Sequence, residues 1–362
     1  MPDPKNSRIA VAMSGGVDSS TVLAILKNQG YELVGITAWI VSGTGRCCDN
    51  GVIDAVKICD QLGVEHHAID LRQDFAEGIV RDFHESYARG ETPIPCISCN
   101  NDVKWGSLLA YSIEKLGATH LASGHYSRLA HQDGQFGLIR PKEARKDQTY
   151  MLWGLTQEQL SRTVFPLADL TKDEVRAIAE ENNLCVASKP ESQDICFVSN
   201  GMSNADYLTR VLGEKPGEII EIESGDVLGE HKGSFNYTYG QRKGLGIAYS
   251  EALYVVEIDP KSNRVYVGTR DKLEGQKAYG KDCNILNSSY INDDDCFEAM
   301  VMIRYNMDAV PARVKLLANN EVEVEFNDPV DAITPGQAIA FYDRETGSEL
   351  IGGAWITREE RA

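Results

Sequence analysis

The first third of the chain alternates between short apolar runs and longer segments whose apolar residues have helical spacing. Apolar runs lie at 9–13, 33–39, 66–71 and 120–123, and helical periodicity lies at 17–27, 52–62, 75–88 and 103–116. Strands that alternate with helices of this length predict right-handed βαβ crossovers. The predicted fold class is therefore α/β, with a Rossmann-like doubly wound parallel sheet covered by helices on both faces.

The pattern changes after Tyr126, where hairpin and barrel signals replace the strand–helix alternation. Gln132-Asp133-Gly134 between two apolar segments predicts a hairpin, and Thr171–Glu174 is a capping box that opens a helix. From about Ala278, short alternating segments separated by turn signals predict a small antiparallel β-barrel. We therefore predict three domains, which are the Rossmann-like domain at 1–202, a small mixed domain at 203–277 and the barrel at 278–362.

The composition is that of an ordinary globular protein, with 362 residues of which 42% are hydrophobic and 25% charged. The first residues show no secretory signal, and no apolar run is long enough to span a bilayer. Nine cysteines without an export signal favour a reducing compartment, where thiols serve catalysis or metal binding more often than structural disulfides. We expect a cytoplasmic protein that does not contact a membrane.

The net charge of −18 argues weakly against a nucleic-acid partner. A local basic patch on an acidic body can still bind phosphates. From charge alone, solvated surface residues are the favoured interpretation of the candidate basic side chains. These candidates are Arg140, Lys142, Arg145, Lys146, Arg242 and Lys243.

The turn after the first apolar run carries the strongest functional signal. It reads Ser14-Gly15-Gly16-Val17-Asp18-Ser19, directly after a predicted strand and before a predicted helix. The two glycines permit a sharp turn and a close ligand approach, and the helix N-terminus presents N–H groups and a positive dipole end to phosphate. An ordinary strand–turn–helix corner is the alternative. The motif lacks the Gly-Lys-Ser/Thr ending of a Walker A loop, and it resembles the fingerprint of the PP-loop ATP pyrophosphatases instead.

Cys96-x-x-Cys99 is the second chemical signal, and we expect it in a loop immediately before a helix. The positive end of that helix would lower the pKa of a thiol. Half of a zinc site is one alternative, but the sequence offers no second Cys-x-x-Cys. A redox pair and two buried apolar thiols remain as further alternatives.

Several motifs occur together in an order that resembles the bacterial tRNA 2-thiouridylase family along nearly the whole chain. They are 14–19, Pro95-Cys96-x-x-Cys99-Asn100, Gly124-His125-Tyr126, Lys146-Asp147-Gln148, Ser192-Gln193-Asp194-Ile195-Cys196-Phe197, 240–246 and Thr334-Pro335-Gly336-Gln337. The resemblance implies that ATP adenylates O2 of the wobble uridine of lysine, glutamate and glutamine tRNAs. Sulfur then replaces that oxygen, and AMP and pyrophosphate are released.

The resemblance also implies the roles of individual residues. Cys196 would carry the sulfur as a persulfide received from a sulfur-donor protein, and Cys99 would be its partner thiol. Mg²⁺ would accompany ATP, with Asp18 a ligand. ATP would contact Ala12, Met13, Ser14, Gly15, Gly16, Val17, Asp18, Ser19, Ala38 and Gly124, and tRNA would contact Ile94, Pro95, Cys96, Lys146, Asp147, Gln148, Arg304 and Tyr305.

Cys96 leaves a second chemistry open, because many relatives have aspartate at its position. Cys96, Cys99 and Cys196 would together suit a 4Fe-4S cluster with one open iron.

A PP-loop ligase of small metabolites and a non-catalytic RNA-binding protein are the rival functions. The pair Cys47-Cys48 has no assigned role. Cys59, Cys185, Cys283 and Cys296 are interpreted as structural or incidental, with Cys59 in the core.

Overall fold

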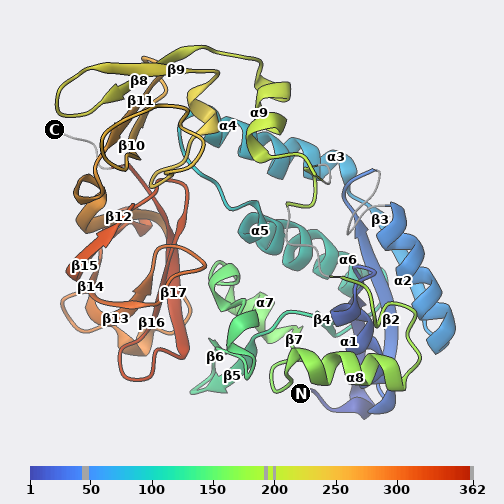
Figure 1. Ribbon diagram of the computed structural model, residues 1–362. Coiled ribbons are helices and arrows are strands. Elements are labelled where there is room, and N and C mark those ends of the chain that lie inside the picture. The colour runs from blue at the N-terminus through green and yellow to red at the C-terminus, as the bar shows by residue number, and fades with distance from the viewer. Residues whose placement is uncertain (43–48, 191–194, 199–200, 359–362) are drawn as a thin grey trace.

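The computed structural model of the protein describes residues 1–42, 49–190, 195–198 and 201–358 (Figure 1). Cys47 and Cys48 lie outside the described residues, as do Ser192, Gln193 and Asp194 of the Cys196 motif. No helix among the described residues is both long and apolar enough to cross a membrane.

The N-terminal part of the chain forms a sheet of five parallel strands, which confirms the predicted α/β class. In spatial order these are β3 (Glu65–Asp70), β2 (Glu32–Trp39), β1 (Arg8–Ala12), β4 (His120–Ala122) and β7 (Thr163–Val164). Four of them match the apolar runs of the sequence. The edge strand β7 was not predicted, because two residues are too short to show any periodicity.

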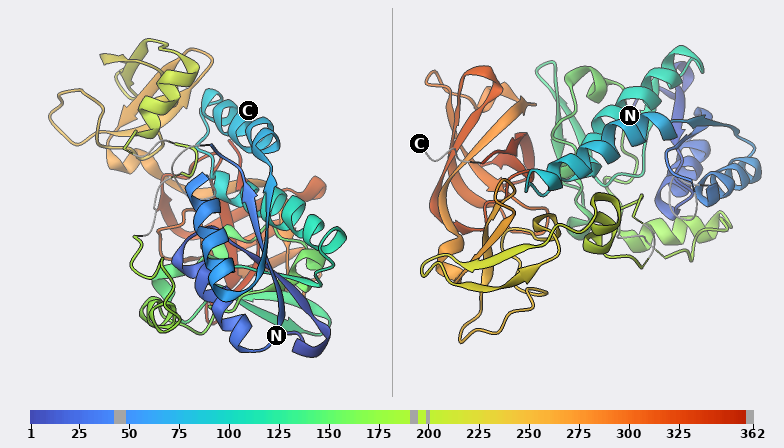
Figure 2. Two further views of the ribbon diagram at one scale, coloured as in Figure 1. Left: turned by 90° about the vertical axis from the view of Figure 1, so that its right-hand side faces the viewer. Right: turned by 90° about the horizontal axis from the view of Figure 1, so that it is seen from above.

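Helices cover both faces of this sheet, as the doubly wound fold requires (Figures 1 and 2). On one face Ile9 and Val11 of β1 pack in one core with residues of α1 (Val17–Asn28), α2 (Asp49–Leu62) and α8 (Lys172–Glu181). Ala10 points to the opposite face and joins a second core that contains Trp105. That face is covered by two long helical stretches, namely α3 (Arg72–Phe75), η2 (Ala76–Val80) and α4 (Arg81–Ala88), then α5 (Pro95–Ser98), η3 (Cys99–Leu108) and α6 (Leu109–Glu114).

The second helical stretch corrects the sequence prediction, which began it at Val103. It begins at Pro95, a residue whose fixed φ suits the first helical position and whose missing N–H costs nothing there. Cys96 and Cys99 therefore lie on the first turns of a helix, and not in a preceding loop. Hydrogen bonding over Cys99–Leu108 is of the π type.

The central region forms a separate four-stranded sheet with spatial order β10 (Tyr254–Asp259), β11 (Arg264–Gly268), β8 (Gly217–Glu221) and β9 (Val227–His231). Helix α9 (Asn204–Leu212) precedes it. The glycine-rich stretch 239–246 forms neither helix nor strand, as predicted. Two short helices, α7 (Gln157–Ser161) and α8, begin with complete capping boxes, and the predicted one at Thr171–Glu174 is confirmed.

The C-terminal region is a closed antiparallel barrel, which confirms the predicted architecture. Its strands are β12 (Glu274–Ile285), β13 (Cys296–Met302), β14 (Val310–Leu316), β15 (Val322–Asp331), β16 (Ala338–Asp343) and β17 (Glu349–Ile356), and pairing of β12 with β17 closes it. The predicted hairpin is present as β5 (Arg128–Gln132) and β6 (Gln135–Ile139), and β6 adds to the edge of β17. The N-terminal domain thus contributes strands to the barrel sheet, and the exact domain boundaries stay a prediction.

The segment that leads into the Cys96 helix is held by the barrel. Pro335 accepts a hydrogen bond from the Thr92 N–H at 2.8 Å, and the Gln337 side chain donates to the Thr92 carbonyl at 2.7 Å. Arg358, beyond the last barrel strand, donates to the carbonyls of Gly90 and Ile258. The Thr334–Gln337 motif therefore joins the barrel to the approach to Cys96, a role that the sequence did not reveal.

Candidate active site

The loop 14–19 is a preformed turn between β1 and α1. The Ser14 N–H donates to Ser19 Oγ at 3.2 Å, and the Ser19 and Ser20 hydroxyls donate to the Gly16 carbonyl. Gly15 has φ +67°, and a Cβ there would lie 2.4 Å from the backbone oxygen of Gly51. The loop is therefore shaped by its own hydroxyls and by glycine, with the N-terminus of α1 behind it.

Neighbouring strands fix where this loop sits. The Met13 N–H donates to the Ile36 carbonyl, and the Thr37 hydroxyl donates to the Met13 carbonyl at 2.9 Å. Gly124 follows β4 and lies so close to the loop that a Cβ would be 2.9 Å from the Ser19 nitrogen. The carboxyl ends of β1, β2 and β4 therefore meet at one edge of the sheet, where ligands bind in open α/β folds.

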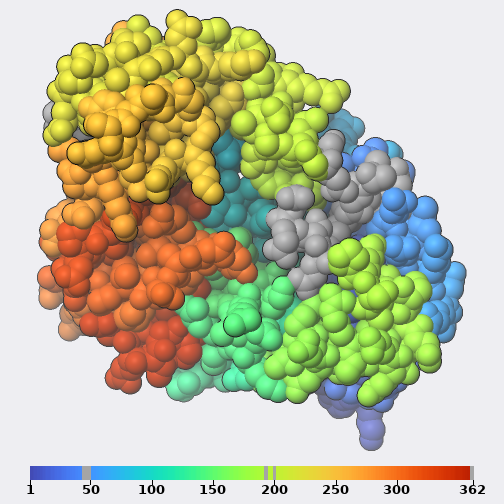
Figure 3. Space-filling view, in the orientation of Figure 1, coloured from blue at the N-terminus to red at the C-terminus, as the bar shows by residue number. Residues whose placement is uncertain are grey.

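One pocket of about 440 Å³ opens at this edge. It collects residues from the loop, from the strand ends, from both cysteine motifs and from the barrel. Figure 3 shows the hollow side of the molecule, with the central sheet and the barrel on one side and the N-terminal domain on the other. Of the predicted site residues, Ala12, Met13, Ser14, Asp18, Ser19, Ala38, Gly124, Pro95, Cys96, Cys99, Cys196, Gln148 and Tyr305 line the pocket.

Cys196 is positioned by its two apolar neighbours. Phe197 packs edge-on against Phe83 and Phe75, with ring centroids 5.1 and 5.9 Å apart. Ile195 packs against the same cluster as Phe197. Cys196 and Cys99 are about 100 residues apart in sequence, and they line the same pocket as the PP-loop.

The surroundings of Cys96 differ from those predicted. Its side chain is open to the pocket, yet the protein packed around it raises the pKa of its thiol by desolvation, while the charge of Lys104 lowers that pKa. The expected lowering by the helix N-terminus is therefore outweighed at Cys96.

Lys104 belongs to a polar row that the sequence analysis did not select. Its ammonium donates to Asn100 Oδ1 at 2.8 Å and lies 3.4 Å from His125 Nε2. His125 Nδ1 lies 2.8 Å from Ser123 Oγ. All four residues line the pocket. Asn100 and His125 belong to motifs that the sequence had already singled out, and the four-residue spacing from Asn100 was the sequence signal for Lys104.

Burial lowers the pKa of His125 well below its ordinary value, and the Lys104 charge lowers it further. Burial also lowers the pKa of His66, His84, His120 and His231. These imidazoles are therefore held in the neutral form in the folded chain at pH values where an unfolded chain protonates them.

We expect this to make the protein acid-sensitive between about pH 7.5 and 5.5. The unfolded histidines bind protons below about pH 6.5 and the folded ones do not, so stability falls by up to about 1.4 kcal/mol per pH unit for each such histidine. Urea denaturation followed by tryptophan fluorescence at several pH values measures this slope. His125→Asn should reduce the slope, and an unchanged slope would contradict the role assigned to His125.

Four predicted tRNA contacts lie outside the pocket lining. Ile94 lines a smaller neighbouring pocket of about 220 Å³, and Lys146 and Arg304 are half-buried. Asp147 is buried, and its carboxylate accepts hydrogen bonds from Arg140 and from the backbone and hydroxyl of Thr149. Asp147 is thus committed to internal contacts in this structure.

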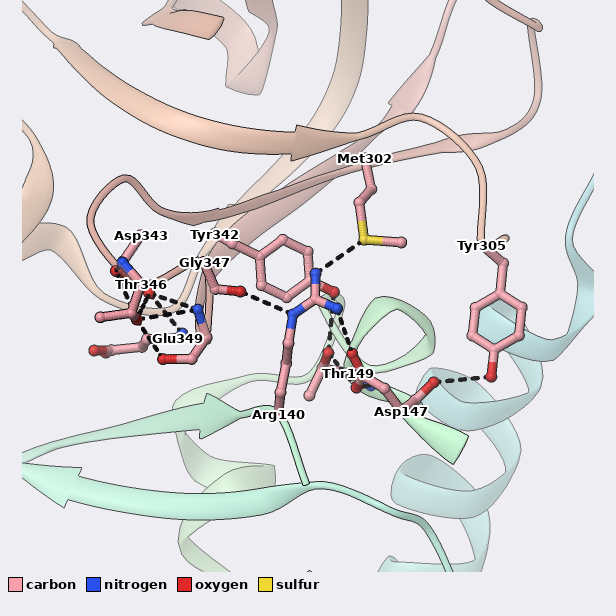
Figure 4. A network of polar contacts seen from close by, with 11 residues as sticks. Arg140, Asp147, Thr149, Met302, Tyr305, Tyr342, Asp343, Thr346, Gly347 and Glu349 are labelled. Carbon is pink, nitrogen blue, oxygen red and sulfur yellow. Dashed lines mark hydrogen bonds and ion pairs between the residues drawn. The ribbon is translucent and has the colours of Figure 1, made fainter. Parts of the chain in front are cut away.

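Arg140 corrects the interpretation of the basic residues as solvated surface (Figure 4). Its guanidinium donates to Asp147 Oδ2 at 3.0 Å and to the Gly347 carbonyl at 2.8 Å, and it lies over the Tyr342 ring. Tyr305 reaches from the barrel to the same segment, where its hydroxyl donates to the Asp147 carbonyl at 2.8 Å. Arg140 and Tyr305 therefore join the segment 140–148 to the barrel.

The cysteines outside the pocket differ in burial. Burial raises the pKa of Cys59 to about 12, which confirms its prediction as a core residue, and Cys296 is also buried. Cys185 is exposed and Cys283 is half-buried. Among the described residues, no three His, Cys, Asp or Glu side chains are grouped closely enough to hold a metal ion.

Three family models match consecutive parts of the chain. They are described as a tRNA methyl transferase HUP domain at residues 7–200, a tRNA methyl transferase PRC-barrel domain at 205–269 and an aminomethyltransferase β-barrel domain at 277–356.

Curated relatives match nearly the full chain. The tRNA-specific 2-thiouridylase MnmA of Synechococcus sp. (strain JA-3-3Ab) is 43% identical over 357 residues, with 98% of this chain and 95% of that protein covered. MnmA of Rippkaea orientalis is 42% identical over 355 residues, with 97% and 99% covered. Among solved structures, the U34-tRNA thiolase NcsA from Methanococcus maripaludis aligns with 52% of this chain and 61% of that one, at 23% identity and a TM-score of 0.35.

Proposed function

The chain belongs to the tRNA-specific 2-thiouridylase family, and we propose that it is an ATP-dependent tRNA-uridine 2-sulfurtransferase. One observation carries this proposal, namely a single pocket lined by the PP-loop and by Cys99 and Cys196. ATP activation and sulfur transfer need these two sets of groups within reach of one substrate atom. A small-metabolite ligase would have no use for the cysteines.

The PP-loop side of the pocket would bind ATP and activate the uridine. A carbonyl oxygen is a poor leaving group, and its attack on the α-phosphate of ATP converts it into a good one. The PP-loop and the N-terminus of α1 would stabilise the pyrophosphate that departs. Ala38 and Gly124 would border the nucleotide, and Asp18 fits a role as Mg²⁺ ligand because it is the only carboxylate among the described residues that line the pocket. Mg²⁺ would neutralise phosphate charge.

The cysteine side would deliver the sulfur. The terminal sulfur of a Cys196 persulfide attacks C2 of the adenylated uridine, and AMP departs with the former O2. The Cys99 thiolate then attacks Sγ of Cys196, which breaks the sulfur–sulfur bond and leaves one sulfur on C2. The resulting Cys99–Cys196 disulfide is reduced by an external thiol, and a sulfur-donor protein reloads Cys196.

The target uridine would enter from the barrel side as a flipped base. Tyr305 and Gln148 line the pocket there, and the Tyr126 N–H donates to Gln148 Oε1 at 2.9 Å. We propose the wobble uridine of lysine, glutamate and glutamine tRNAs as the substrate. Arg145, Arg242 and Lys243 are exposed and are available for backbone phosphates despite the acidic net charge.

A 4Fe-4S cluster on Cys96, Cys99 and Cys196 is the alternative sulfur chemistry. The described residues do not group three such ligands, so we route no step through a cluster. The Cys96→Ser variant decides between the two routes. We expect it to retain at least about a third of wild-type activity, because only Cys99 and Cys196 act in the persulfide cycle.

The assay is anaerobic thiolation of unmodified tRNA with ATP, Mg²⁺ and a sulfur donor, read as 2-thiouridine by mass spectrometry of digested tRNA. Loss of activity in Cys96→Ser together with iron and sulfide in the wild-type protein would replace the persulfide cycle by the cluster. Absence of both thiouridine and AMP from the wild-type reaction would refute the proposed function itself.

A further inference from the structure

A lysine from a distant helix lies against the PP-loop. Lys172 occupies the first turn of α8, and its ammonium donates to Asp18 Oδ1 at 2.6 Å. The Tyr126 hydroxyl donates to the same oxygen at 3.0 Å. The Lys172 side chain is only 13% exposed and that of Asp18 is 23% exposed, so this ion pair is largely withdrawn from solvent.

The main chain holds Lys172 in this place independently of Asp18. The capping box of Thr171 and Glu174 fixes the start of α8. One turn further, the Thr21 hydroxyl of α1 donates to the Val175 carbonyl at 3.3 Å and ties the two helices together. Because α1 follows the PP-loop directly, Lys172 is fixed relative to the loop by rigid elements.

The bound nucleotide changes what this ion pair faces. Asp18 repels phosphate oxygens unless its charge is balanced, and Asp18 would hold Mg²⁺ when the ion accompanies ATP. The Lys172 ammonium and the Asp18 carboxylate lie side by side at the PP-loop, so an anion that binds next to Asp18 comes within reach of Lys172 as well. The phosphate oxygens of ATP, and then of pyrophosphate, are the anions that arrive next to Asp18.

We propose that Lys172 is a nucleotide-binding residue that exchanges the Asp18 carboxylate for the phosphates of ATP and stabilises the departing pyrophosphate. This inference rests on the proposed function, since it assigns a further residue to the same ATP site. The ion pair also has a role before the nucleotide binds, because Lys172 balances the charge of Asp18.

The experiment measures the ATP affinity of the full-length protein and its variants by isothermal titration calorimetry. Each protein is titrated once with excess EDTA and once with Mg²⁺. Lys172→Met should weaken ATP binding at least about tenfold in both conditions. Lys142→Met is the matched control, because the Lys142 ammonium lies 3.0 Å from Glu174 of the same helix, whereas the Lys172 ammonium lies 2.6 Å from Asp18 of the PP-loop. It should change affinity less than about twofold, and melting curves check that each variant is folded.

The Asp18→Asn background separates direct contact from an effect through Asp18. If Lys172 touches the phosphates, adding Lys172→Met to Asp18→Asn still weakens metal-free ATP binding about tenfold. If Lys172 only neutralises Asp18, the double variant binds within about twofold of Asp18→Asn, and the inference is overturned while the proposed function stands. A wild-type protein that binds no ATP in either condition would overturn both.

Discussion

Substitution of Cys196 by serine is expected to abolish 2-thiouridine formation while the folded protein still binds ATP. A hydroxyl cannot carry sulfane sulfur. Of the three cysteines that the structure describes in the pocket, Cys196 alone is followed by an anchored aromatic, Phe197. The adenylated uridine then lacks its nucleophile. We expect at least a thousand-fold loss of thiouridine, measured by mass spectrometry of digested tRNA.

Cys99→Ser should fail at a later step and leave a different product. Once the persulfide sulfur is bonded to C2, the proposed cycle relies on the Cys99 thiolate to break its bond to Cys196. In a single turnover without added thiol, persulfide-loaded Cys99→Ser should therefore accumulate a covalent enzyme–tRNA adduct. The adduct is visible as a shifted band of labelled tRNA on a non-reducing gel, and dithiothreitol should release it as thiolated tRNA.

Cys185→Ser is the matched control for both variants, because Cys185 is an exposed thiol that does not line the pocket. It should thiolate tRNA like the wild type. Full activity of Cys196→Ser would refute the persulfide assignment. A Cys99→Ser protein that releases thiouridine without any reductant would remove Cys99 from the cycle.

The sheet and its ligand edge could be predicted from sequence because their signals are local. Buried parallel strands leave apolar runs such as Ile9–Val11, and the carboxyl ends of such strands must share an edge. Ser14, Ala38 and Gly124 each follow a predicted strand or lie near its end, so this reasoning assigns them to one edge together with Cys47. The structure has the first three in one pocket, and Cys47 lies outside the described residues. The helix start at Pro95 was missed because Gly90–Pro95 resembles a loop, although proline also suits a first helical turn.

The missed contacts depend on partners far away in sequence. Asp18 and Lys172 are 154 residues apart, and no periodicity connects them. A charged residue is interpreted as solvated until its partner is known, and for Arg140 the partners are Asp147 nearby and Gly347 on the barrel. A charged residue and its distant partner become buried together only when the domains pack against each other, so no local sequence pattern marks the pair.

Gly15→Ala is expected to destroy ATP binding. Comparison with Gly117 shows that a steric clash, and not the positive φ alone, is the reason. Gly15 and Gly117 have nearly the same conformation, with φ +67° and +65°. An alanine in this left-handed region costs about 1 kcal/mol at either position. Only Gly15 faces a neighbour, because its Cβ would lie 2.4 Å from the backbone oxygen of Gly51, whereas nothing lies within 4 Å of Gly117.

The Gly15 clash can be relieved only by moving the PP-loop or the start of α2, since both contacting groups are backbone. We expect a loss of ATP affinity of at least a hundredfold in Gly15→Ala, together with a stability loss of about 2–4 kcal/mol. Gly117→Ala should lose about 1 kcal/mol and bind ATP like the wild type. Calorimetric ATP titration and urea denaturation measure the two effects separately. Equal ATP affinity in the two variants would mean that the loop tolerates displacement, and the preformed phosphate cradle would have to be abandoned as the source of ATP binding.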